Sequence, residues 1–243
     1  MERKSFLKSL SIFAATPFVL SGCSKSSTSV STDKDIASAD TTTADTSCSV
    51  TPTETEGPFP TKTPSSYVRS DIRKGDGIGA NMNVVITITN INNNCNVLSN
   101  TIVDIWHCDV NGDYSEYGGT TMQSNNYTSA HWLRGRQVTG SAGTVTFQTI
   151  FPGWYQGRAT HIHVHVYSAE GNSLLVTQIA FPDTLCNTVN TTGASYGYTK
   201  GMSGYTYNAN DNVFSDGYSK ELATVTGSLS NGFDLAIGIN VKA

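Results

Sequence analysis

The chain has 243 residues, only 14% of which are charged, and its formal net charge is −4. That length suits one medium domain with appendages, and the abundance of Gly, Ser, Thr and Asn favours a β protein outside the cytoplasm over a helical one. Because basic residues are few and unclustered, we exclude a nucleic-acid-binding protein.

The N-terminus has the pattern of a bacterial lipoprotein signal peptide, residues 1–22. Three basic residues precede an apolar run, residues 10–20, which is too short to span a bilayer. The sequence Leu-Ser-Gly-Cys then resembles a lipobox, with Cys23 as the lipidated first residue of the mature chain. The alternative is an ordinary cleaved signal peptide with an incidental cysteine. We therefore expect a protein of the bacterial cell envelope, facing the periplasm or the exterior, that contacts the membrane only through the lipid on Cys23.

Residues 23–47 are mostly Ser, Thr, Asp and Ala without apolar periodicity, which predicts a flexible tether. The folded domain is expected to span residues 48–243. It holds four cysteines: Cys48, Cys95, Cys108 and Cys186. An even number in an oxidising compartment favours at least one disulfide, with three connectivities open for two bridges. Buried free thiols are the alternative.

Seven β-type runs recur between turn signals: residues 84–89, 101–106, 143–148, 161–167, 174–181, 222–226 and 233–241. No stretch shows sustained helical periodicity. The pattern predicts an all-β protein with an antiparallel β-sandwich core, long connecting loops and little helix, with a barrel as the alternative. Residues 187–220 are rich in Asn, Gly, Ser and Tyr and are expected to form a long loop over one end of the sheets.

The strand at residues 161–167 carries the strongest functional signal. Side chains alternate between the two faces of a strand, so His161, His163 and His165 share one face and the aliphatic residues between them share the other. Neutral imidazoles at this spacing suit a transition metal. Tyr155 and Arg158 lie just upstream. Phenolate is a hard oxygen donor, so histidines together with tyrosines suggest ferric iron more than zinc.

Three segments in order, residues 53–59, 103–115 and 152–163, resemble the intradiol ring-cleavage dioxygenases, which are non-haem Fe(III) enzymes that open catechols. The resemblance spans roughly residues 48–243. It is closest to the secreted branch of the family, in which only a short Gly-Arg segment separates the second tyrosine from the histidine pair. The resemblance implies a small aromatic diol and O2 as substrates, and a muconate-type diacid as product.

The same resemblance assigns roles to individual residues. The implied Fe(III) ligands are Tyr114, Tyr155, His161 and His163. By the family pattern Tyr155 is also a displaceable base, Arg158 stabilises developing negative charge on the substrate, and Gln178 lines the pocket.

Several alternatives stay open. Tyr117 competes with Tyr114 as the first tyrosine ligand, and Arg158 could instead form a surface salt bridge. Gln178 could be a strand-pairing amide. His165 lies roughly 13 Å from His161 along an extended strand, so we expect it to be packed or hydrogen-bonded.

Two other classes of function also remain. One is a lipid-anchored binding module without turnover, and the other is a copper or zinc binder that uses the three strand histidines. The oligomeric state and the particular catechol are not predicted.

Overall fold

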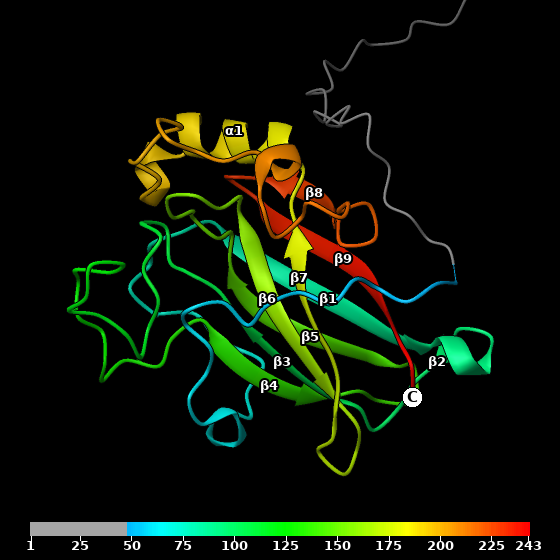
Figure 1. Cartoon of the computed structure of the whole chain (residues 1–243). Coiled ribbons are helices and arrows are strands. Elements are labelled where there is room, and N and C mark those ends of the chain that lie inside the picture. The colour runs from blue at the N-terminus through cyan, green and yellow to red at the C-terminus, as the bar shows by residue number, and fades with distance from the viewer. Residues whose placement is uncertain (1–47) are drawn as a thin grey trace, which may run out of the picture. The chain divides into compact units, whose positions relative to one another are not determined.

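In the computed structural model, which describes residues 48–243, two β-sheets pack face to face (Figure 1). Apolar side chains from both inner faces form the core between them, as expected for a β-sandwich. The all-β prediction with little helix is confirmed. The proposed signal peptide, the lipid on Cys23 and the tether to residue 47 lie outside the described residues.

The first sheet, which we call sheet A, is antiparallel and contains the histidine strand. Its strands, in spatial order, are β4 (Arg134–Val138), β3 (Ile102–Trp106), β6 (His161–Tyr167) and β7 (Ser173–Ala180). The aliphatic residues of β6 are buried in the core, so its histidines lie on the outer face of the sheet. In the strand register, Trp106 on β3 and Gln178 on β7 are both paired with His163.

The second sheet, sheet B, is mixed. Its strands are β2 (Asn96–Val97), β1 (Asn81–Asn90), β5 (Thr144–Ile150), β9 (Gly232–Val241) and β8 (Thr224–Ser228). β1 pairs in parallel with β9 and antiparallel with β5. The expected antiparallel sandwich is therefore observed except at one pair of strands, β1 and β9, which run parallel. A parallel pair needs a long connection, and here most of the domain lies between the two strands.

Strands β2 and β4 and helix α1 were not predicted, and β2 has only two residues. Strand β4 has the sequence Arg-Gly-Arg-Gln-Val, which lacks a β-type pattern, but it is held by pairing with β3 and by a two-point ion pair between Arg136 and Asp104 (2.6 and 2.7 Å). Helix α1 (Asp183–Thr192) replaces the beginning of the expected loop. It buries little more than Cys186 and Val189 against the core, too few apolar positions for a helical period to show in the sequence.

The first described residues form an extended segment, residues 50–60, that we call the arm. It crosses the outer face of sheet A in front of β6 and β7 (Figure 1). The Glu54 backbone N–H donates to the Val176 carbonyl at 2.8 Å. A disulfide between Cys48 and Cys95 fixes the chain just before the arm, which confirms the expectation of at least one bridge. Within residues 48–243, no helix has the length and apolar content needed to cross a bilayer.

Candidate active site

Three donor atoms from two distant segments meet on the outer face of sheet A. The Nε2 atoms of His161 and His163 are 3.1 Å apart, and the Tyr114 hydroxyl is 3.2 Å from His161 Nε2. All three side chains are buried. The Nδ1–H of His161 donates to the Ala159 carbonyl at 2.7 Å, so the Nε2 lone pair of the neutral ring points into the cluster.

Burial keeps these side chains neutral. It lowers the pKa of His161 and His163 well below the usual value, and the nearby Arg158 charge adds to the effect. Burial also raises the pKa of Tyr114 well above its usual value. The pKa of Tyr155 is raised by burial as well, while Arg158 opposes the rise. A bound cation would favour the phenolate forms, so the cluster is built to receive positive charge.

The second tyrosine reaches the same cluster. The Tyr155 ring lies edge-on to His161 and Tyr114, with centroid separations of 5.6 and 5.8 Å. Tyr117, the alternative to Tyr114, donates its hydroxyl to the Pro60 carbonyl at 2.7 Å. Tyr114 and not Tyr117 therefore faces the histidines.

The donor set fits a metal of ferric type. Metal–nitrogen bonds of about 2 Å place neighbouring ligand atoms about 3 Å apart, which matches the 3.1 and 3.2 Å separations seen here. Within residues 48–243, no group of three or more His, Cys, Asp and Glu residues could hold a metal ion. Tyr114 and Tyr155 are the side chains beside His161 and His163 that could add protein ligands to a metal there, and phenolate oxygen is a hard donor suited to Fe(III).

Arg158 is a buried, fixed cation beside this cluster. Its Nε donates to both carboxylate oxygens of Asp211 at 2.9 Å, and its Nη2 donates to the Gln178 side-chain carbonyl at 2.6 Å. Its Nη1 is 3.5 Å from the Tyr155 hydroxyl. The alternative of a surface salt bridge is wrong because only 7% of Arg158 is exposed.

Gln178 joins Arg158 to the arm. While its carbonyl accepts from Arg158, its Nε2 donates to the backbone carbonyl of Thr55 at 2.8 Å. The side chain lies on the same face of sheet A as the histidines and is fully buried. Its side chain thus spans from the arm to the guanidinium instead of pairing strands.

The arm and β3 enclose His163. A β-carbon at Gly57 would lie 3.0 Å from His163 Cε1, and Gly57 has a φ of +67°, so only glycine suits this position. The Trp106 indole stacks on the His163 ring with centroids 4.9 Å apart. Phe59 stacks on Tyr114 at 4.8 Å. The arm therefore shields the donor cluster from water.

The other histidines have structural partners. His165 is 3.0 Å from Glu56 and 2.8 Å from Ser173, in agreement with its predicted packed and hydrogen-bonded role. His107 contacts the Thr149 hydroxyl at 2.7 Å, and burial lowers its pKa to about 4.

Sequence reasoning missed Asp211 and Arg134. Asp211 lies in the loop after α1, in a stretch rich in Asn and Gly that gave no signal for a functional carboxylate. Arg134 is 1% exposed and donates to the Phe59 and Ser115 backbone carbonyls, at 3.0 and 2.6 Å. It thereby ties the arm to the loop that carries Tyr114. Only the Arg158 motif could have suggested a partner such as Asp211.

Known proteins share both this sequence pattern and this fold. A family model described as "Dioxygenase" matches residues 55–192, more than half of the chain. The chain resembles an intradiol ring-cleavage dioxygenase from Tetranychus urticae, with 29% identity and a TM-score of 0.70 over 80% of this chain and 95% of that one. It also resembles the dioxygenase domain of a dioxygenase and carbohydrate-binding protein fusion from Streptomyces sp. SirexAA-E, with 25% identity and a TM-score of 0.56 over 80% and 99% of the two chains.

More distant structures share the fold alone. Hydroxyquinol 1,2-dioxygenase from Pseudomonas putida DLL-E4 is 15% identical, with a TM-score of 0.55 over 80% of this chain and 67% of that one. A comparison with curated protein sequences found no match. The family match covers residues 55–60 of the arm, the tyrosines and the histidine strand together, and on this ground the chain belongs to the intradiol ring-cleavage dioxygenase family.

Proposed function

We propose that the protein is an Fe(III) intradiol dioxygenase that inserts both atoms of O2 between the two hydroxylated carbons of a catechol-type aromatic. The product is a muconate-type diacid. The observation that carries the proposal is the convergence of the Tyr114 hydroxyl with the Nε2 atoms of His161 and His163. Two neutral imidazole nitrogens and one buried phenol oxygen form a donor set that suits ferric iron.

The residues that would hold the iron are Tyr114, Tyr155, His161 and His163. When bound, the iron supplies Lewis acidity and electron acceptance that make the catechol ring reactive toward O2. The pairing of His161 Nδ1–H with the Ala159 carbonyl fixes the ring orientation that ligation needs.

The remaining steps fall to this chain's own side chains. Tyr155 Oη, which would be a phenolate when it holds the iron, is the base that we assign to one catechol hydroxyl proton. Arg158 lies 3.5 Å away and counteracts the rise in the pKa of Tyr155, which favours this phenolate form. The Arg158 guanidinium also faces the region where negative charge develops on the ring. Asp211 and Gln178 hold this guanidinium in place before the substrate arrives, which is the preorganisation that electrostatic catalysis requires. The arm excludes water from the reacting atoms.

The test combines metal content, colour and turnover of the protein expressed in iron-replete medium. We expect about one iron per chain by elemental analysis, a visible tyrosinate-to-iron charge-transfer band, and O2 uptake with catechol, protocatechuate or hydroxyquinol. His161→Ala and His163→Ala should lose the iron because each deletes a ligand. Tyr155→Phe should keep much of the iron but slow catechol binding and turnover.

His165→Ala is the matched control, because His165 lies on the same strand and face but pairs with Glu56. It should retain iron and colour. Stoichiometric zinc or copper without iron would overturn the metal assignment. Full iron occupancy in both His161→Ala and His163→Ala would overturn the ligand assignment. An iron-loaded protein that turns over none of these diols would instead support the binding module without turnover.

A further inference from the structure

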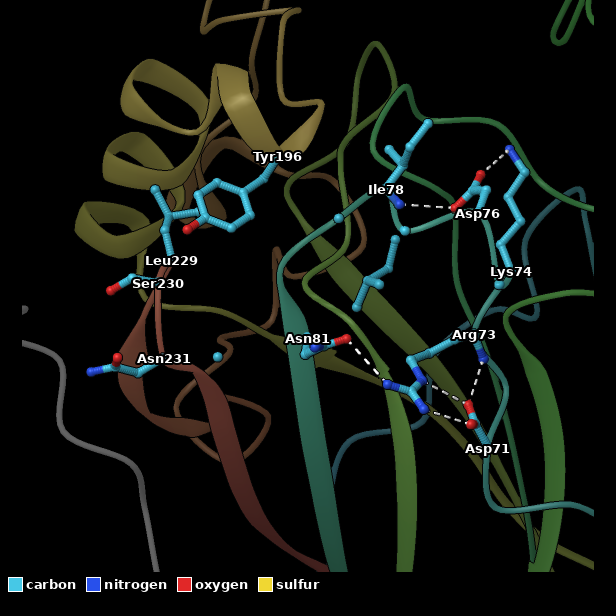
Figure 2. Close-up of a pocket in the computed structure, with 15 residues that line it drawn as sticks. Asp71, Arg73, Lys74, Asp76, Ile78, Asn81, Tyr196, Leu229, Ser230 and Asn231 are labelled. Carbon is cyan, nitrogen blue, oxygen red and sulfur yellow. Dashed lines mark hydrogen bonds and ion pairs between the residues drawn. The ribbon is translucent and has the colours of Figure 1, made fainter.

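A groove on the opposite side of the sandwich lies apart from the candidate active site. A cavity of about 730 Å³ opens at the end of sheet B where β1 begins, between the segment at residues 71–79 and the turn at residues 229–232 (Figure 2). None of the proposed iron ligands lines it. Its volume falls within the range of about 300–1,000 Å³ that is typical of small-molecule sites.

The cavity continues along the outer face of sheet B. A second cavity of about 280 Å³ shares Arg73, Asn81, Asn231 and Gly232 with the first and extends as far as Asp234. Across this face Asn83 is paired in register with Gln148 on β5 and with Asp234 on β9. The two cavities therefore form one groove.

The polar side of the groove is preorganised. Arg73 forms a two-point ion pair with Asp71, at 2.9 and 2.7 Å, and it also donates to Asn81 at 3.3 Å and to Gln148 at 3.4 Å. These contacts hold a planar guanidinium, a carboxylate and two amides in fixed orientations on an exposed surface. Such groups offer both donors and acceptors at defined positions.

The other side of the groove combines apolar side chains with the polar residues Ser230 and Asn231. Figure 2 shows Tyr196 and Leu229 across the cavity from Arg73 and Asp71, with Asn81 between them. Ile78 contributes to the same cavity and is 47% exposed, so its side chain is accessible to a ligand. A ligand in the groove would thus contact both apolar side chains and polar groups.

The charges of the lining disfavour anionic ligands. Each cation in the lining already faces a carboxylate, because Arg73 pairs with Asp71 and Lys74 lies 3.3 Å from Asp76 and 3.6 Å from Asp109. The groove therefore offers no unpaired positive charge for an anion. Its remaining carboxylate, Asp234, accepts from the Asn83 side-chain amide at 3.5 Å and pairs with neither cation, so it also disfavours an anion. A wholly apolar ligand is also disfavoured. It would remove these ion pairs from water, and it has no polar groups to replace the hydrogen bonds that they make to water.

We propose that this groove binds an uncharged oligosaccharide. A pyranose ring presents a C–H face that can pack on Tyr196 and Ile78, and hydroxyls that can bond to the fixed amides and guanidinium of Arg73, Asn81 and Asn231. The second cavity continues the site beyond the first, which provides room for more than one such ring. Because the groove lies on sheet B and the donor cluster on the outer face of sheet A, the bound glycan leaves the candidate active site accessible.

Calorimetric titration of the full protein with cellohexaose, xylohexaose and laminarihexaose tests the proposal, with hexagalacturonate as the charged comparison. We expect at least one uncharged hexasaccharide to bind. Asn231→Ala and Tyr196→Leu should each weaken it about tenfold, the effect of losing one or two good contacts. Asn96→Ala, an exposed asparagine on β2 outside the groove, is the matched control and should bind as the parent does.

Three results would overturn the proposal. They are no binding of any uncharged hexasaccharide at millimolar concentration, binding that both groove variants leave unchanged, and binding of hexagalacturonate alone. Melting temperatures close to that of the parent show that the variants are folded. The proposal is independent of iron and of dioxygenase turnover, so it stands or fails separately from the proposed function.

Discussion

At the scale of single residues, substitutions of Arg158 and Asp211 can test catalysis without removing a proposed iron ligand. Arg158 contacts Asp211, Gln178 and Tyr155 but is not among the proposed iron ligands. Asp211 has a second role, because it also accepts the Ala159 backbone N–H at 2.7 Å. The Ala159 carbonyl in turn orients His161. One buried carboxylate thus supports both the guanidinium and a histidine.

We predict that Arg158→Ala keeps the iron and the colour but lowers turnover by about 10²–10³, the loss expected for removing one preorganised donor. Arg158→Lys should restore only part of the rate, because a point charge does not reproduce the planar fork. Steady-state O2 uptake, together with iron content, measures both effects. A rate for Arg158→Ala equal to that of the parent would remove this residue from the mechanism.

We predict that Asp211→Asn lowers kcat about tenfold, because its neutral amide holds Arg158 less firmly than a carboxylate does. The decisive comparison is the double variant. If Asp211 acts through Arg158, adding Asp211→Asn to Arg158→Ala should cost little further activity. Independent, multiplying losses in the double variant would show that Asp211 acts by another route, for example through the Ala159 backbone.

At the scale of elements, the arm is the part of the chain that completes the site. It contributes Gly57 beside His163, Phe59 against Tyr114 and the Thr55 carbonyl that Gln178 binds. Arg134, a buried residue of β4, then ties the arm to the loop with Tyr114. The arm therefore couples the two segments that supply the proposed ligands.

We predict that Gly57→Ala destabilises the arm and weakens iron retention, because the added β-carbon presses on the His163 ring. Gly171→Ala is the matched control. Gly171 also has a positive φ, +87°, but a β-carbon there meets nothing within 4 Å. The control should lose about 1–2 kcal/mol from backbone strain alone and keep its iron. Urea unfolding and iron content after dialysis against a chelator measure the two effects, and equal iron loss in both variants would contradict the role given to Gly57.

At the scale of the whole molecule, a buried carboxyl group links stability to pH. Glu221 is fully buried, and burial, reinforced by the charges of Glu54 and Asp216, raises its pKa from 4.5 to about 8. The Thr177 hydroxyl donates to Glu221 at 2.9 Å. Between these two pKa values the folded state keeps a proton that the unfolded state releases. Glu221 therefore lowers stability progressively as pH rises from about 4.5 to about 8.

We predict that Glu221→Gln is close to the parent in stability at pH 5 and more stable at pH 8, by an amount of order 1–4 kcal/mol, because each pKa unit corresponds to about 1.4 kcal/mol. The glutamine carbonyl can still accept from Thr177. Glu170→Gln is the control, because Glu170 is exposed and its pKa is lowered, not raised, by its hydrogen bond with Ser168. Urea unfolding across this pH range measures the difference. A gap between Glu221→Gln and the parent that does not widen with pH would contradict the prediction.

Local pattern alone determined much of the fold. Alternation along residues 161–167 predicted both the strand and its aliphatic inner face, because neighbouring side chains must point to opposite sides of a sheet. The turn-bounded β-type runs likewise predicted the all-β sandwich. Strand β4 and helix α1 escaped prediction because pairing with β3, an Arg136–Asp104 ion pair and a few core contacts hold them, and none of these appears in a local pattern.

The sequence by itself determined which residue types could bind a metal, because the strand period places His161 and His163 on one face and the motif brings Tyr155 and Arg158 near them. Only the tertiary structure decided which tyrosine faces the histidines. Tyr114 and Tyr117 lie in the same loop, and the conformation of that loop directs Tyr114 to His161 and Tyr117 to Pro60. It alone brought Asp211 to Arg158, 53 residues away along the chain. The physical reason is that local side-chain alternation is fixed by backbone geometry, whereas contacts between distant segments depend on how the whole chain packs.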